Sequence, residues 1–203
     1  MSAFKTICKA SRSEYKEMKS KFLSFAYPIS CVEDVKPLVD NLKAEYFDAR
    51  HHCFAWRLDE QTINKTEKNI ATYRTNDDRE PNNTAGVPIL AAIDSKELKN
   101  ILIVVVRYFG GIKLGASNLA KAYRQAAENA IEEAEIITEV PKSPIVFSFD
   151  FGVMGQVNKF LKDNSFTKED YSYLEANKIR LMVDNDDKER IENTLKSIYG
   201  IRI

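Results

Sequence analysis

This sequence has no net charge, no long hydrophobic run and few cysteines. Each of these absences excludes a class of protein. The 30 Lys and Arg residues balance the 30 Asp and Glu residues, so no overall electric field draws the molecule toward nucleic acid or membrane. The longest aliphatic run, ILIVVV, is far shorter than the roughly 20 residues of a membrane-spanning helix. Attraction to an anionic partner must therefore come from a local patch, and no membrane partner is expected.

Cysteine and histidine are too few and too poorly spaced for a disulfide framework or a metal site. The 3 cysteines lack CxxC spacing and fit reduced thiols. With no apolar block of signal-peptide length near the N-terminus, we expect a cytoplasmic protein. The only two histidines, His51 and His52, are adjacent on a predicted strand and point to opposite faces, so no metal site is expected.

Two prolines in the segment TEVPKSPI divide the chain into two predicted domains. They end a long helical pattern, and a strand pattern begins directly after them. We expect one domain in residues 1–140 and a smaller one in residues 143–203. In the smaller one, the predicted order of strand, helix, two strands, helix and a short last strand is that of a ferredoxin-like βαββαβ domain.

The segment RYFGGIKLGASNLAKAYR lies between a predicted buried strand and a helix predicted over residues 116–137. A helix amino end exposes unpaired N–H groups that attract anions, and glycines let a ligand approach the backbone closely. No acidic residue occurs from Leu98 to Ala127. The predicted binding site for an anion or nucleic acid comprises Arg107, Gly110, Gly111, Lys113, Gly115, Ser117, Lys121 and Arg124.

Two other interpretations of this segment are a phosphate-binding loop and a purely structural turn. A phosphate-binding P-loop needs Lys followed by Ser or Thr after the last glycine, and Ala116 and Ser117 stand there instead, so the P-loop is rejected. A tight strand-to-helix turn with solvated cations remains an open alternative.

The segment DDREPNNTAG forms a second candidate cluster, made of Glu80, Thr84 and Gly86. Pro81 holds Glu80 in an extended or turn conformation. Thr84 is the expected N-cap of a following helix, which would give a second amino end able to bind anions. A surface loop with a well-capped helix is the alternative.

Together these segments resemble the YigZ/Impact family, through HHCFAWRL, EPNNTAGVPIL and VVVRYFGGIKLGASNLAKAY. The resemblance spans roughly residues 12–135. It implies an α+β protein: a two-layer α/β sandwich similar to the second domain of a small-subunit ribosomal protein, followed by a domain similar to domain V of elongation factor G. The chain departs from the family pattern at Asn82, Asn83, Ser117 and Asn118, where the family usually has Ser or Gly.

The resemblance implies no established reaction and no cofactor, and its eukaryotic members act in translational regulation. Our leading hypothesis is a cytosolic protein that contacts RNA or the ribosome, with Arg107 and Lys113 on phosphates. The second hypothesis is an enzyme acting on a phosphorylated small molecule or nucleotide, with His52 and Glu80 as acid or base. The third is a protein-interaction module. The sequence carries no signal for an oligomeric state.

Overall fold

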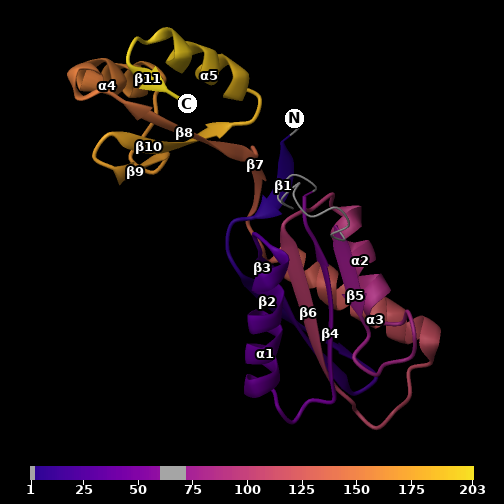
Figure 1. The fold of residues 1–203 in the computed structure, drawn as a ribbon. Coiled ribbons are helices and arrows are strands. Elements are labelled where there is room, and N and C mark those ends of the chain that lie inside the picture. Colours follow the sequence, from indigo (N-terminus) through magenta and orange to yellow (C-terminus); the bar gives the residue numbers. More distant parts are fainter. Residues whose placement is uncertain (1–2, 60–71) are drawn as a thin grey trace. The chain divides into compact units, whose positions relative to one another are not determined.

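The computed structural model describes residues 3–59 and 72–203 of the chain. The chain divides into two compact units, one of Phe4–Glu139 and one consisting chiefly of Val140–Ile203. Helices pack on antiparallel sheets in both units, which confirms the predicted α+β class (Figure 1). No helix in the described ranges is long and apolar enough to cross a membrane.

A five-stranded antiparallel sheet forms the centre of the larger unit. Its strand order is β2-β3-β6-β4-β5. β6 occupies the middle because its β-branched and aliphatic residues are buried on both faces. The five strands are β2 (Ser11–Glu17), β3 (Ser20–Pro28), β4 (His51–Arg57), β5 (Tyr73–Asn76) and β6 (Ile101–Tyr108). A separate two-stranded sheet joins β1 (Phe4–Ile7) to β7 (Ile136–Glu139).

Helices cover both faces of the five-stranded sheet. The short 3-10 helix η1 (Val32–Asp34) leads into α1 (Val35–Glu45), which packs on one face. The helices α2 (Gly86–Ser95) and α3 (Ala116–Glu132) pack on the other. The structure therefore adds a layer to the expected two-layer sandwich, because β6 presents apolar side chains on both sides and each side needs a cover. The helix predicted over residues 116–137 ends at Glu132.

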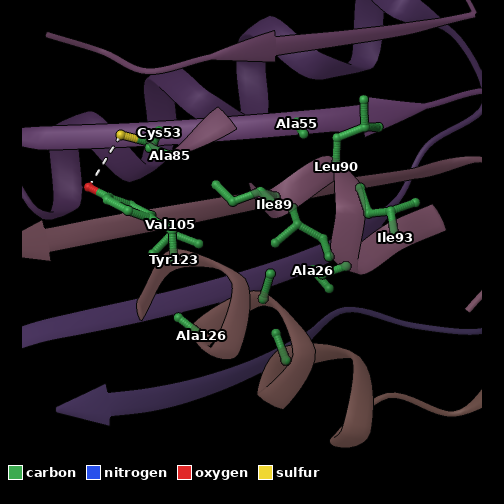
Figure 2. Packing of buried hydrophobic residues seen from close by; sticks show 14 of the residues in the cluster. Ala26, Cys53, Ala55, Ala85, Ile89, Leu90, Ile93, Val105, Tyr123 and Ala126 are labelled. Carbon is green, nitrogen blue, oxygen red and sulfur yellow. Dashed lines mark hydrogen bonds between the residues drawn. The ribbon is translucent and has the colours of Figure 1, made fainter. Parts of the chain in front are cut away.

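Small side chains bring α2 and α3 close to the sheet. Four alanines of α3 are almost completely buried, which fits the alanine-rich helical pattern of the sequence. Figure 2 shows the apolar side chains from the two helices and the strands that meet here, among them Ala26, Ala55, Ile89, Ile93, Val105 and Ala126. Because the layer is this thin, little room exists for a larger side chain on the inner face of α3.

The smaller unit has the predicted ferredoxin-like order. Its elements are β8 (Lys142–Phe149), the short 3-10 helix η2 (Phe151–Val153), α4 (Met154–Asp163), β9 (Tyr171–Glu175), β10 (Lys178–Asp184), α5 (Lys188–Ser197) and β11 (Ile201–Arg202). The strands follow the order β11-β8-β10-β9, and every pair is antiparallel. Phe147 and Phe149 of β8 belong to its buried core.

We predict that Ala126→Leu destabilises the larger unit by about 1–3 kcal/mol, because the added atoms overpack the layer between α3 and the sheet. Gln125→Leu adds a leucine at the neighbouring exposed position and should change stability by less than about 0.5 kcal/mol. Urea unfolding followed by the fluorescence of Trp56, the sole tryptophan and a core residue of this unit, measures both. Equal stability of the two variants would contradict the packing described.

Candidate functional site

A buried ion pair lies at the end of β6. Arg107 Nη1 donates a hydrogen bond to Glu80 Oε1 at 2.6 Å, and the two side chains are only 6% and 5% exposed. The hydroxyl of Tyr123, on α3, donates to the same carboxylate oxygen at 2.8 Å. Because both charges are removed from water, either one would be costly to bury without the other. Arg107 is therefore neutralised by a carboxylate of its own chain, which corrects its prediction as an open cation for phosphate.

The strand register and two aromatic rings hold the Arg107 side chain in place. Phe22 on β3 and His51 on β4 both lie opposite Arg107 in the sheet. The guanidinium carbon lies 5.4 Å from the ring centre of Phe22 and 5.6 Å from that of Phe109. Such contacts stabilise a cation, most of all when it is desolvated. The register and the rings together direct the guanidinium toward the α2–α3 side, where Glu80 lies.

A row of polar groups continues from Glu80 beneath α3. The Cys53 thiol donates a hydrogen bond to the hydroxyl of Tyr123, with Sγ and the oxygen 3.4 Å apart. A dashed line marks this bond in Figure 2. Burial raises the pKa of the Cys53 thiol and that of the Tyr123 hydroxyl well above their ordinary values. Because a thiol reacts as the thiolate, Cys53 is held in its unreactive form.

His51 Nε2 lies 3.9 Å from Glu80 Oε1, and His51 Nδ1 lies 2.9 Å from the carbonyl oxygen of Asp78.

The predicted acid–base pair of His52 and Glu80 is not formed. The His52 ring faces the other side of the sheet, near Leu42 and Tyr46 at the end of α1, and burial lowers its pKa. Adjacent strand residues alternate between faces, so only His51 can face Glu80. The prediction was wrong in choosing between the two histidines, because the sequence does not say which face of β4 the DDREPNN loop approaches.

A pocket of about 360 Å³ opens beside the ion pair. Glu80 and Lys113, from segments far apart in the sequence, both line it. Its walls also include Arg107, Phe109, the amino end of α3 at Gly115 and Ala116, and the apolar side chains of Pro81, Leu114 and Leu119. Four of the predicted residues, Glu80, Arg107, Lys113 and Gly115, are thus brought to one place. Phe109 was missed, although it stands inside the predicted segment.

The amino end of α3 is open. Gly115 precedes the helix with a φ of 75°, a left-handed conformation that glycine adopts without strain. As the N-cap residue, Gly115 has no side chain that could cap this end. A Cβ atom added at Gly111 or Gly115 would meet nothing within 4 Å, so the space in front of both glycines is free. The first N–H groups of α3 therefore remain available to an anion.

Gly110 has a different role from the predicted one. A Cβ atom there would lie 2.0 Å from the carbonyl group of Lys19 in the β2–β3 hairpin. The Gly110 N–H also donates to Ser20 Oγ at 3.3 Å. The close approach that Gly110 permits in this structure is that of the chain itself.

Three further predicted residues lie on the outer surface of α3. Ser117, Lys121 and Arg124 are exposed and are separated by one helical turn each, so they share one face of the helix. Arg124 Nε donates a hydrogen bond to Glu128 Oε1 at 2.8 Å. A surface ion pair of this kind contributes little to the stability of the protein. These residues do not line the pocket.

The amino end of α2 is closed by the carboxylate of Asp77. Asp77 Oδ1 accepts hydrogen bonds from the N–H groups of Ala85 and Gly86 at 3.0 and 2.8 Å, and Oδ2 accepts one from Asn83 at 2.8 Å. Thr84 Oγ1 instead donates to the carbonyl oxygen of Pro81 at 2.6 Å. Thr84 is therefore not the cap that the sequence predicts, and the second expected anion site has its donors occupied.

Gly86 also serves the fold. A Cβ atom at this position would lie 2.7 Å from the backbone nitrogen of Asn76, so only glycine lets α2 start so close to β5. Glu80, the third member of that predicted cluster, belongs instead to the ion pair with Arg107.

We predict that Arg107→Met lowers the free energy of unfolding by about 3–5 kcal/mol, because it leaves the Glu80 carboxylate buried without its counter-ion. The double variant Glu80→Gln/Arg107→Met should be more stable than the sum of the two single variants implies, by at least about 1 kcal/mol. Urea unfolding of the four proteins measures this coupling. Additive effects would show that the two side chains do not depend on each other.

Comparison with known proteins places this site inside a described domain. The model of the Impact N-terminal domain matches residues 18–131, which include the ion pair and the whole pocket. The IMPACT family member YvyE of Bacillus subtilis (strain 168) is 29% identical over 170 residues, which are 84% of this chain and 75% of that protein. The IMPACT family member YigZ of Escherichia coli (strain K12) is 36% identical over 127 residues.

The YigZ match covers 63% of this chain and spans 58% of that relative's length. A crystal structure of a hypothetical protein covers 100% of this chain and 96% of its own, with a TM-score of 0.72 and 25% sequence identity. The domain match and the similarity to several IMPACT family members agree with one another. The chain belongs to the YigZ/Impact family, and the ion pair and pocket lie in its Impact N-terminal domain.

Proposed function

We propose that this is a cytoplasmic, translation-associated protein that binds RNA at the pocket beside the Glu80–Arg107 ion pair. The observation that carries the proposal is the convergence of the uncapped amino end of α3 and Lys113 on one pocket. A helix end with free N–H groups and a nearby cation is suited to a phosphate group.

The positive potential at the pocket comes from the helix end and Lys113. Arg107 contributes little net charge, because Glu80 neutralises it. Lys113 forms no ion pair with another described residue, so its ammonium group is available to a ligand. The 17-residue helix α3 supplies a full set of aligned peptide dipoles behind the free N–H groups.

A polymer fits this surface better than a small phosphorylated metabolite does. Beyond the pocket, Lys121 and then Arg124, which is in a surface pair with Glu128, continue along the exposed face of α3. A single phosphate at the helix end would not reach them, whereas successive phosphates of an RNA strand would. The resemblance of the fold to domains of translation factors supports the same partner, but only by analogy.

The enzyme hypothesis has one observation in its favour, since His51 and Glu80 lie on the same face near the pocket. Two others weigh against it. The Glu80 carboxylate is already engaged by Arg107 and Tyr123, and Cys53 is held as a thiol. We therefore prefer binding to catalysis.

We predict that Lys113→Ala weakens the binding of single-stranded RNA regardless of its sequence. It should also lower the slope of the logarithm of the binding constant against the logarithm of salt concentration by about 0.7, the value for one lost phosphate contact on a single strand. Fluorescence anisotropy with a labelled uridylate octamer, measured at several salt concentrations, gives both quantities.

Lys43→Ala is the matched control. Lys43 is an exposed lysine of α1, on the opposite face of the same sheet, and its removal should leave both quantities unchanged. The proposal fails if the octamer does not bind, or if Lys113→Ala and Lys43→Ala have equal effects.

A further inference from the structure

The interior of the pocket differs in chemistry from its rim. The rim carries Lys113 and the free N–H groups of α3, which suit a phosphate. Pro81, Leu114 and Leu119 contribute apolar side chains to the same lining. Phe109 borders it with a side chain that is 42% exposed. A phosphate alone would leave this apolar space unfilled, so the ligand must also carry an apolar or flat group.

One oxygen of the Glu80 carboxylate accepts no hydrogen bond from the described residues. Both hydrogen bonds that described residues donate to this carboxylate, from Arg107 and Tyr123, end on Oε1. Within the described ranges, the fully buried side-chain atoms without a partner are His52 Nε2 and Arg107 Nε, so Glu80 Oε2 is not sealed off. Glu80 lines the pocket, and Oε2 is its carboxylate oxygen without a hydrogen bond from a described residue. A carboxylate oxygen there favours an N–H donor and disfavours a second anion.

A nucleobase meets both requirements. Each base has a flat face that stacks on an aromatic ring such as Phe109, and unpaired bases of single-stranded RNA are commonly recognised by stacking and by their Watson–Crick edges. Guanine presents two adjacent donors on that edge, N1–H and the N2 amino group. Uracil presents a single N–H between two carbonyl oxygens, which would repel the carboxylate. The volume of about 360 Å³ lies within the range of small-molecule pockets.

We infer that the pocket takes one unstacked nucleobase, and guanine in preference to uracil. The base stacks on Phe109 with its Watson–Crick edge toward Glu80 Oε2, and the attached phosphates lie at Lys113 and the amino end of α3. This inference rests on the proposed RNA binding and assigns a base-specific pocket to the same site. A free guanine nucleotide has the same chemistry and is the other source of such a base.

The test compares three RNA octamers on the full chain by fluorescence anisotropy: a uridylate octamer, the same octamer with one central guanosine, and the same octamer with one central abasic site. We expect the guanosine octamer to bind at least about fivefold more tightly than the other two, the discrimination given by one good base contact. Equal affinities for the three octamers would overturn the base pocket. If those equal affinities still fall with Lys113→Ala, the RNA-binding proposal stands alone.

Phe109→Ala tests the stacking surface. It should reduce the affinity of the guanosine octamer to that of the abasic one. Phe47→Ala removes a phenylalanine that is 83% exposed at the end of α1 and should leave the guanosine preference intact. Retention of the preference in Phe109→Ala would overturn the inference, and binding of no octamer would overturn both proposals.

Competition by GMP identifies the source of the base. If GMP displaces the guanosine octamer at concentrations near the dissociation constant of that octamer, the pocket is a mononucleotide site, which supports the base pocket with a free nucleotide as its ligand. If GMP competes only at far higher concentrations while the guanosine preference persists, the base belongs to bound RNA.

Discussion

Glu80 and Arg107 come from a loop and a strand that are 27 residues apart in the sequence, and their ion pair joins the two beneath α3. Tyr123 adds a third element by donating to the same carboxylate oxygen. Because the charges are buried, separating them would leave each one without a partner in apolar surroundings, at a large cost in free energy. This constraint fixes the DDREPNN loop against the end of β6 and so shapes the pocket between that loop and the amino end of α3.

The two helix ends of this domain show why such an end is not by itself a binding site. At α2, the N–H groups of Ala85 and Gly86 already donate to Asp77, so the end is satisfied within the chain. At α3, the glycine-rich loop provides backbone freedom but no capping side chain. The same local pattern of loop and helix therefore gives a structural cap in one place and an open donor site in the other.

Local pattern was enough to predict much of this molecule. The unbroken apolar, β-branched run of β6, the alanine face of α3 and the βαββαβ order of the smaller unit are all properties of short segments, and the structure has them. The site was predicted less well because its contacts are non-local. Asp77 caps α2 from nine residues before Gly86, and Gly110 is needed for a hairpin that is 90 residues away in the chain. The choice of His51 over His52 depends on which face of β4 the loop reaches. That face depends on contacts between segments distant in the sequence, such as the Glu80–Arg107 pair, which no spacing in the sequence reveals.

The availability of the α3 amino end is the claim on which the functional account depends most. The most direct measurement is the change in backbone amide resonances when a uridylate octamer is added to the isotope-labelled chain. We predict shifts at Ala116 and Ser117 and none at Ala85 and Gly86, because Asp77 already holds those two N–H groups. Binding of the octamer without any shift at Ala116 and Ser117 would contradict the account.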